Sequence, residues 1–496
     1  MPEEETAGSA EFASPPAPPV RRWRAFALLA VSFFMTIVDL TIVNVALPTI
    51  GRALHFSESD LQWVVTAYAI TFGGFLLLGG RAADLLGRRR ILMLGLAVFS
   101  AASLGAGLAR NDALLVALRG VQGFGAALVL PAALSIVMTM FAEGAERNKA
   151  LGLWGAIGAA GATFGVLTGG LLTRYAGWEY IFFLNVPVGA AALLLAPRIV
   201  PESRLAGARR RFDPLGAVTV TGALLLLVYT ISKAPQAGWG SARTVTLLAV
   251  SAALLLAFLV IEARAAAPLV PLRIFRLRTV AVANAVGLLL GGSFFGFIFI
   301  GTLYMQQVLG YSALRTGTAW LAATITSVAL AGLSQWLVTR ISAGPVMALG
   351  MALIAGGIVW ATQVPVGGHY WSALAGPFFV TGAGTAFAFI PISIAGLTGV
   401  AGPEAGLASG LLNTSQQLGG AIGVALASTV AATRFTTLLG QGQAANAALT
   451  GGFRWGLWVC GIIAMLALPA TAVLFRRAAA PPGLGYVTGQ MVKADG

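Results

Sequence analysis

Long apolar stretches separated by short polar connections run along nearly the whole chain. A helix needs about 20 consecutive apolar residues to cross the hydrocarbon core of a bilayer. We therefore expect a membrane-spanning helix in each run of that length, which gives fourteen: 24–47, 60–80, 90–109, 113–140, 148–173, 179–197, 214–232, 243–262, 279–308, 315–340, 345–363, 371–395, 404–431 and 453–475. Residues 1–19 and the tail beyond Arg477 are rich in polar residues, Pro and Ala, and they predict disorder.

The composition also indicates an all-α, polytopic membrane protein. Of 496 residues, 58% are hydrophobic and 10% are charged, with a mean hydropathy of +0.86, whereas soluble domains carry about 25% charged residues. The net charge of +14 comes from basic residues in short loops. There they are expected to set the orientation of the helices in the membrane and to contact anionic lipid headgroups, and we expect no nucleic-acid partner. The single Cys460 excludes an intrachain disulfide, and His55 and His369 lack companion ligands, so we expect no metal site.

Basic residues are distributed unevenly between alternate connections. With the N-terminus in the cytoplasm, the cytoplasmic segments hold 22 Lys and Arg residues and the outer loops hold 8, while Arg119 lies within a helix. Cytoplasmic loops of membrane proteins carry such an excess, and one omitted helix would reverse every later loop. The distribution predicts an even number of helices with both termini in the cytoplasm. The first run is too long for the apolar region of a signal peptide and carries Asp39, so we expect an uncleaved first helix.

Two glycine patterns recur along the chain at nearly the same offset. Gly152, Gly161 and Gly165 reappear 258 residues later as Gly410, Gly419 and Gly423, and Val121-x-Gly-x-Gly-x-Ala with Pro131 reappears at Val380 with Pro391. Both matches pair helices eight apart, which predicts two six-helix halves and two inserted helices. We expect a disordered cytoplasmic N-terminus at 1–23, a six-helix bundle at 24–200, a linker with two extra helices at 201–278, a second six-helix bundle at 279–477 and a disordered cytoplasmic tail at 478–496.

Asp39 lies about midway along the first apolar run, with no basic residue near it in sequence. Ionisable residues at that depth are costly, so they usually face the bundle interior and mark ion or substrate paths. In the fourth run Arg119 and Gln122 share a helix face with Gly123. Arg119 either faces the bundle or extends to the outer headgroups, and we expect it to face the bundle.

The connection between the second and third runs combines spaced glycines with charges: Gly80, Asp84, Gly87, Arg88, Arg89 and Arg90. Gly87 permits a tight turn, and Asp84 can form charge-assisted contacts with the arginines. A cluster that served topology alone would need the arginines but not the spaced glycines or Asp84. No comparable segment of spaced glycines and charges occurs at the end of the tenth run, where residues 333–340 lie. We therefore expect such a charged contact in the first half of the chain only.

The fifth run is rich in glycines spaced three or four residues apart, with one further glycine directly after the last of them: Gly152, Gly155, Gly158, Gly161, Gly165, Gly169 and Gly170. Small residues at these spacings let helix backbones approach closely. We expect this pattern to join the two halves on the outer side, with general helix packing as the alternative.

Polar and aromatic residues in other runs are candidates for a substrate cavity: Asn44, Trp63, Tyr68, Tyr304, Gln306, Gln307, Asn413, Gln416 and Gln417. Amides are costly against lipid and should face the interior or other helices. Structural packing is the alternative for the amides, and a place in an interfacial aromatic belt is the alternative for Trp63.

These motifs resemble those of the fourteen-helix drug/proton antiporters of the major facilitator superfamily, from about Arg24 to Arg477. The segment 39–48 is similar to the first-helix signature L-D-x-T-V-V-N-V-A-L-P, with Val38 and Ile42 as departures. Residues 80–90 match all five fixed positions of G-x-x-x-D-x-x-G-R-R/K, and residues 119–125 resemble R-x-x-Q-G-x-G. The fifth run resembles the antiporter signature, although Val166 stands where the family usually has proline.

The resemblance implies roles for these residues. Proton coupling is implied for Asp39, Arg119 and Gln122, and a conformational latch for Gly80, Asp84, Gly87, Arg88 and Arg89. An antiporter packing motif is implied for Gly152, Gly155, Gly161, Gly165, Gly169 and Gly170. The expected fold is two six-helix bundles with two inserted helices.

The expected function is proton-coupled export of amphipathic organic compounds, such as drugs or antibiotics, by alternating access in a bacterial cytoplasmic membrane. No G-x-x-x-x-G-K-[ST] phosphate loop is present, so we expect no cofactor, no enzymatic activity and a proton gradient as the energy source. One alternative is a dedicated exporter of one endogenous metabolite, and a further alternative is an importing symporter or uniporter. A membrane receptor that transports nothing is a remote alternative. The expected partners of this monomer are the substrate, protons and the lipid bilayer.

Overall fold

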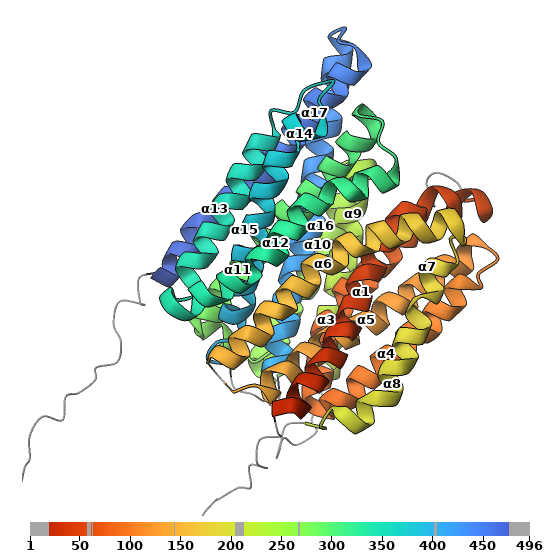
Figure 1. Ribbon diagram of the computed structural model, residues 1–496. Helices are drawn as coiled ribbons and strands as arrows, with labels where there is room; N and C mark the ends of the chain where they lie inside the picture. Colours follow the sequence, from red (N-terminus) through yellow and green to blue (C-terminus); the bar gives the residue numbers. More distant parts are fainter. Residues whose placement is uncertain are drawn as a thin grey trace, which may run out of the picture.

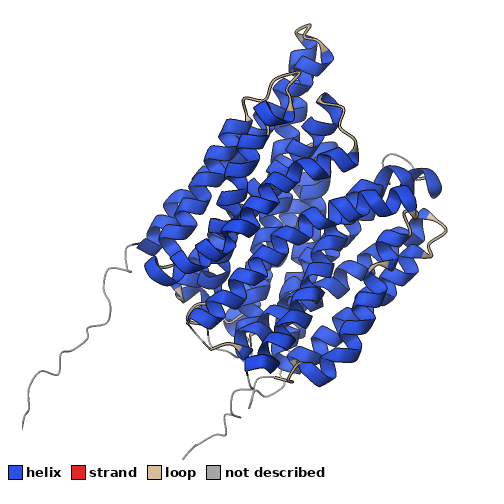
Figure 2. Cartoon of the chain, viewed as in Figure 1, coloured by secondary structure: helices blue, strands red, loops and turns tan. Residues whose placement is uncertain are grey.

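The computed structural model describes residues 19–56, 61, 63–142, 144–203, 213–265, 268–400 and 404–475, and every regular element within them is helical (Figure 2). The N-terminal half contains α1 (Pro19–Ala53), α3 (Trp63–Leu86), α4 (Arg88–Gly107), α5 (Asp112–Met140), α6 (Ala145–Tyr175), α7 (Tyr180–Phe183) and α8 (Asn185–Ile199). The two helices that the sequence predicts to be inserted, called the inserted helices below, are α9 (Pro214–Ala237) and α10 (Ala242–Arg264). The C-terminal half contains η1 (Leu272–Arg276), α11 (Arg278–Leu303), the π-helical turn η2 (Tyr304–Val308), α12 (Ala313–Ile341), α13 (Ala343–Ala361), α14 (Tyr370–Ala373), α15 (Ala375–Leu397), α16 (Ala405–Gly440) and α17 (Ala445–Phe475).

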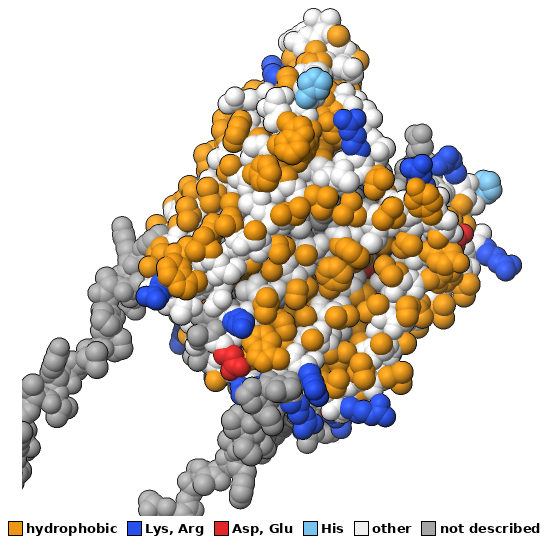
Figure 3. Space-filling view, in the orientation of Figure 1, with side chains coloured by type: hydrophobic (Ala, Val, Ile, Leu, Met, Phe, Trp, Pro, Cys, Tyr) orange, Lys and Arg blue, Asp and Glu red, His pale blue; other side chains and the backbone are white. Residues whose placement is uncertain are grey.

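Thirteen helical stretches in the described part of the chain are long and apolar enough to cross a membrane. They coincide with the predicted runs apart from the fifth, where α6 is 31 residues long and packs between α1 and α12. On the face shown in Figure 3, apolar side chains cover the middle of the surface, and the visible Lys and Arg side chains lie mostly toward its two ends. The chain is therefore an all-α, multi-pass membrane protein, as its sequence predicts.

The two halves lie side by side and are built alike (Figure 1). In the N-terminal half α1 packs on α6, α5 packs on α3 and α4, and α4 packs on α8. In the C-terminal half α11 packs on α16, α15 packs on α12 and α13, and α13 packs on α17. The same order of contacts in both halves identifies them as structural repeats. The end of the bundle that holds the start of α1 and the α3–α4 turn is called the proximal end below, and the opposite end the distal end.

The recurring glycines lie at equivalent helix contacts in the two halves. A Cβ atom on Gly165 would meet α1, and one on Gly423 would meet α11, the equivalent helix of the second half. In the same way Gly123 faces α3, and Gly382 faces α12. The repeat in the sequence therefore reflects repeated close approaches between helix backbones.

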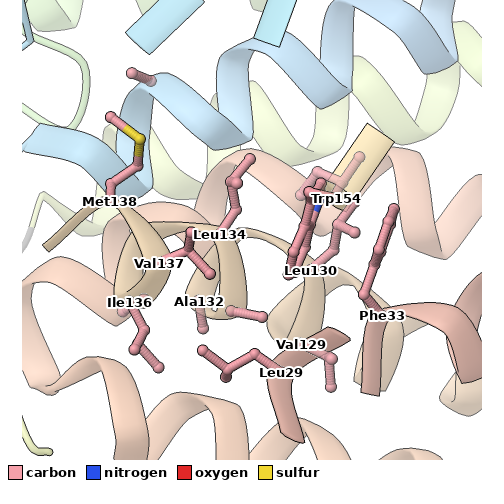
Figure 4. Close-up of a cluster of buried hydrophobic side chains, with 14 of the residues drawn as sticks. Leu29, Phe33, Val129, Leu130, Ala132, Leu134, Ile136, Val137, Met138 and Trp154 are labelled. Atoms are coloured by element: carbon pink, nitrogen blue, oxygen red, sulfur yellow. The ribbon is translucent and has the colours of Figure 1, made fainter. Parts of the chain in front are cut away.

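An apolar core joins α1, α5 and α6 toward the proximal end (Figure 4). Phe33 of α1 stacks on Trp154 of α6, with ring centroids 4.3 Å apart. Leu29 and Val129 are fully buried beside them. This packing fixes the direction in which α1 crosses the bundle and so positions Asp39, which lies farther along the same helix.

The first helix begins earlier than the sequence predicts. Residues 19–23, which we expected to be disordered, form the first turns of α1. Trp23 packs on Phe141 with ring centroids 5.0 Å apart, and Arg22 pairs with Glu146 of α6 at 3.3 Å. These contacts stabilise helical residues that lie outside the apolar run. The disorder expected at 1–18 and 478–496 falls outside the described residues.

The last two helices are longer than their apolar runs, because α16 ends at Gly440 and α17 begins at Ala445. Their hairpin projects beyond the other helices at the distal end (Figure 1). Hydropathy marks only the part of a helix that is compatible with lipid, whereas a sequence with adequate helix propensity can continue into water.

The inserted pair lies at the boundary between the halves. α9 packs on both α3 and α16, and α10 packs on α9. Trp63 of α3 stacks on Tyr229 of α9, with ring centroids 5.9 Å apart. Just beyond the end of α9, Trp239 Nε1 donates a hydrogen bond of 2.8 Å to Thr429 Oγ1 of α16. The inserted helices therefore bridge the two halves on one side of the bundle.

Candidate functional site

Asp39 is fully buried in α1, where its carboxylate accepts hydrogen bonds from two other helices. Arg119 Nη1 of α5 lies 2.7 Å from Oδ2. Gln122 Nε2 of α5 and Asn185 Nδ2 of α8 each lie 2.8 Å from Oδ1. Buried charges are tolerated when they are paired and hydrogen-bonded, and Asp39 meets both conditions.

Arg119 lies inside the bundle and does not extend toward the headgroups. Its Nε donates to the Val64 carbonyl at 3.0 Å, and its Nη1 also donates to Gln122 Oε1 at 2.7 Å. The guanidinium lies over the ring of Tyr68, 4.3 Å from its centroid. Carbonyl acceptors and an aromatic face both offset the cost of removing this cation from water. The site thus joins α1, α3, α5 and α8.

Two members of this site, Asn185 and Ser103, were not among the residues expected from the sequence. Asn185 Nδ2 and Gln122 Nε2 each donate to Ser103 Oγ at 3.0 Å, and that hydroxyl donates to the Phe182 carbonyl at 2.9 Å. Asn185 is an amide within an apolar run, so the reasoning applied to Asn413 would also have selected it. Ser103 carries no such signal, because single serines are common in membrane helices.

At the proximal end Asp84 of α3 connects the two halves. Its carboxylate accepts hydrogen bonds from the backbone N–H groups of Gly406 at 3.2 Å and Leu407 at 2.9 Å, in the first turn of α16. The N-cap residue of α16, Glu404, makes no side-chain cap of its own. A carboxylate at a helix N-terminus satisfies orphan donors and interacts favourably with the helix dipole. Asp84 therefore caps a helix of the opposite half.

The rest of the 80–90 segment supports this contact. Arg88 donates to Asp84 from Nη2 at 2.9 Å and from Nε at 3.1 Å. Gly87, with φ at 113°, forms the turn into α4 in a conformation that favours glycine. A Cβ atom on Gly80 would lie 3.0 Å from the Gly406 carbonyl carbon, so the backbones of α3 and α16 touch here. Arg89 pairs with Glu202, at 3.7 Å, within the N-terminal half.

The glycines of α6 face in two directions. A Cβ atom on Gly161, Gly165 or Gly169 would meet α1 of the same half. The other three contact the C-terminal half, where Gly152 meets Gln335, Gly155 meets Ile390 and Gly170 meets Leu314. The expectation that the whole motif joins the halves on the outer side is therefore wrong. Glycines four residues apart share the face covered by α1, and Gly152 lies near the proximal end.

The aromatic residues expected in a substrate cavity pack against protein instead. Tyr68 is buried under Arg119, and Tyr304 is buried with its hydroxyl donating to the Pro365 carbonyl at 2.6 Å. Trp63 lies against α9 and Lys233, whose Nζ is 4.6 Å from the ring centroid. For Tyr68 and Tyr304 the expectation of a cavity surface is wrong, because neighbouring helices cover both rings.

The amides expected in the cavity remain accessible to different degrees. Asn44 and Gln307 are exposed, and Asn413, Gln416 and Gln417 are half-buried. Asn44 and Asn413 each bond to carbonyls of their own helix, one turn back. A role of these amides in substrate binding stays a prediction.

Comparison with known proteins agrees with the arrangement of the helices. A family model described as Major Facilitator Superfamily matches residues 29–424. The cephamycin export protein of Amycolatopsis lactamdurans is 37% identical over 472 residues, which cover 94% of this chain and 95% of that protein. The puromycin resistance protein of Streptomyces alboniger is 36% identical over 468 residues, covering 94% and 92% respectively. The tetracenomycin C resistance and export protein of Streptomyces glaucescens is 33% identical over 414 residues, covering 84% and 77%.

Among solved structures, a proton:xylose symporter superposes with a TM-score of 0.62 at 15% identity and covers 92% of this chain and 96% of that one. A human organic anion transporter gives a TM-score of 0.61, also at 15% identity, with 92% and 100% covered. At such identity the likeness shows the fold alone. Because the family model matches most of the chain, and relatives above 30% identity span more than nine-tenths of it, this protein is a transporter that belongs to the major facilitator superfamily.

Proposed function

We propose that this transporter exports amphipathic organic compounds, antibiotics among them, across the bacterial cytoplasmic membrane in exchange for protons. The relatives described above, named for antibiotic export or resistance, support the substrate class. The single observation that supports proton coupling is the buried Asp39–Arg119 pair, a titratable group between helices of a transport bundle.

The proximal end is assigned to the cytoplasm. The start of α1 and the α3–α4 turn lie at that end, and both belong to the sequence segments that hold 22 Lys and Arg residues against 8 in the alternate loops, as cytoplasmic segments do in other membrane proteins. Both termini then lie in the cytoplasm. We expect the protein to act as a monomer, since the Asp39 site and the Asp84 contact are each formed within one chain.

The proposed transport cycle depends on two contacts between helices, the Asp84 cap on α16 and the Asp39–Arg119 pair. The described state is closed at the cytoplasmic end, where Asp84 caps α16. In the opposite state, open to the cytoplasm, substrate binds while Asp39 is ionised. Protonation from outside then neutralises Asp39, which favours substrate release and return, because a ligand shifts the equilibrium toward the state that it binds better.

Proton movement in inverted vesicles tests this function. Vesicles with an acidified lumen and a luminal pH dye receive puromycin, a cephamycin, tetracenomycin C or ethidium, one at a time. An exchanger raises the luminal pH when a transported compound is added, and vesicles with the Asp39→Asn variant do not respond. Uptake without a pH change would indicate a uniporter, and a fall in luminal pH would indicate a symporter. A response to one compound alone would favour a dedicated exporter.

A further inference from the structure

The hydrogen bonds around Asp39 distinguish its two carboxylate oxygens. Oδ1 accepts from Gln122 Nε2 and from Asn185 Nδ2, each at 2.8 Å. Among the described residues, Oδ2 accepts from Arg119 Nη1 alone, at 2.7 Å. A carboxylate oxygen offers about two acceptor positions, so the two amides fill those of Oδ1, whereas the described residues fill one of those of Oδ2.

The chemistry of the partners fixes the orientation of both amides. Arg119 can only donate, so the oxygen of Gln122 faces Arg119 and its nitrogen faces Asp39. Ionised Asp39 can only accept, so the nitrogen of Asn185 must face it as well. Oδ1 is therefore held by two amide donors from different helices, α5 and α8.

Ser103 uses the remaining hydrogens of these amides. Each amide nitrogen donates its second hydrogen to Ser103 Oγ at 3.0 Å, and Ser103 donates its own to the Phe182 carbonyl. Ser103 therefore holds both amides in the orientation that fills Oδ1. Fully connected buried networks of this kind specify one arrangement of their members.

We propose that the proton taken up by Asp39 binds Oδ2, and that Asn185 is a positioning residue that directs it there by keeping Oδ1 occupied. The inference rests on the proposed role of Asp39 in proton coupling. In this step one O–H bond of a hydronium ion breaks and one O–H bond forms at Oδ2, which leaves a water molecule and a neutral carboxyl group beside Arg119.

A proton on Oδ2 weakens one contact and keeps the others. The hydroxyl oxygen retains acceptor capacity, so Arg119 can still donate to it, but the contact is no longer an ion pair because the carboxyl group is neutral. Arg119 keeps the Val64 carbonyl and the face of Tyr68. Asp39 remains bonded to Asn185 through Oδ1, so α1 stays attached to α8 while its charge attraction to Arg119 of α5 is lost. A proton on Oδ1 would also neutralise the carboxyl group, but it would have to displace one of the two amide donors.

Few other groups near Asp39 can titrate. Arg119 faces Asp39, and Tyr68 packs on the guanidinium. The other titratable residues of α1, α3, α4, α5, α6, α7 and α8 lie near helix ends: Arg21, Arg22, Arg24, Arg52, Arg81, Asp84, Arg88, Arg89, Arg90, Asp112, Glu146, Arg147, Lys149, Arg174, Tyr175, Tyr180 and Arg198. A carboxyl signal that is lost in Asp39→Asn therefore reports this site.

Infrared titration of the full-length protein in lipid vesicles tests the inference without any substrate. The protonated-carboxyl band that is absent from Asp39→Asn is followed against pH. Asn185→Leu keeps a branched side chain of similar length and Asn185→Ala leaves a space, but both remove the donor. Because that donor stabilises the ionised carboxylate, we expect both variants to be half-protonated at a pH about one unit higher, a tenfold change in proton affinity.

Two further variants separate positioning from general packing. Ser103→Ala should shift the midpoint in the same direction by less, since it frees the amides without removing them. Asn284→Ala is the matched control, because Asn284 is a buried amide of the other half, bonded to the Val280 carbonyl and to Ser415; its midpoint should equal that of the wild type. Midpoints for both Asn185 variants that match the wild type would overturn the inference. Proton-driven export by Asp39→Asn would instead overturn the proposed function.

Discussion

Asp39 and Arg119 carry opposite charges in a part of the protein that lipid surrounds, and each is tolerated there because of the other. The same pair explains why neither residue can be changed alone without a cost in stability. Removing one partner of a buried pair leaves an uncompensated charge, which typically costs about 3–5 kcal/mol.

Asp39→Asn should therefore insert but unfold at a lower temperature, and uphill export should fall at least tenfold, because an amide cannot take up and release the proton. The double variant Asp39→Asn/Arg119→Gln removes both charges and should regain much of the lost stability without regaining export. Tryptophan fluorescence during heating and uphill export in inverted vesicles measure the two effects. Full pH-driven export by a well-expressed Asp39→Asn protein would contradict the proposed coupling.

Tyr68 allows a separate test of the aromatic contact. Tyr68→Phe keeps the ring under Arg119, so we expect stability and export close to those of the wild type. Tyr68→Leu keeps an apolar side chain but removes the aromatic face, which should destabilise the protein by about 1–2 kcal/mol. If the leucine and phenylalanine variants unfold at the same temperature, the cation–π contact does not stabilise the site.

At the scale of helices, the site depends on how closely α1 approaches α6. Gly165 faces α1, and a Cβ atom there would lie 2.7 Å from the Val38 carbonyl oxygen and closer still to Thr41 Oγ1. No side chain can fit in that space unless the helices separate. Since Val38 precedes Asp39 in the chain, such a separation would move the carboxylate relative to Arg119.

Gly165→Leu should therefore abolish export or convert it to a proton leak. Gly332→Leu is the matched control, because a Cβ atom on Gly332 of α12 has no neighbour within 4 Å among the described residues; we expect unchanged export. Val166→Pro should leave export largely intact, since membrane helices tolerate proline where neighbouring groups satisfy the freed carbonyl. Export unaffected by Gly165→Leu but strongly raised by Val166→Pro would show that a bend, and not close packing, governs this helix.

At the scale of the whole molecule, the two halves meet at the proximal end through Asp84 and the first turn of α16. The interaction crosses 323 residues of sequence and depends on a charge at a helix N-terminus. It is buried and reinforced by Arg88. The contact exists only while the halves are close together at this end, so it should favour the state described here.

Asp84→Asn should shift the population toward the state open at the proximal end and slow turnover several-fold, with little change in substrate affinity. Spin labels on the exposed Leu86 of α3 and Ile341 of α12 report the separation of the halves. Asp112→Asn, which changes an acidic residue at the distal end, should leave the distances unchanged. A sharp loss of substrate binding with unchanged distances would rule out the latch.

The approximate positions of the helices follow from sequence alone, as does the selection of Asp39, Arg119 and Asp84. The reason is that transfer of apolar residues and charges into lipid has a free energy that depends mainly on the residue itself. The glycine repeat likewise predicts two related halves, because each close helix approach requires small residues at fixed spacing.

The partners of these residues were decided by tertiary structure. Asn185 lies 146 residues from Asp39 in the chain, and Asp84 caps a helix whose sequence shows no sign of needing a distant cap. The direction in which each α6 glycine faces also depended on which helix packs beside it. Hydrogen bonds and helix contacts of this kind depend on the relative placement of remote segments, and hydropathy and spacing within one segment carry no information about that placement.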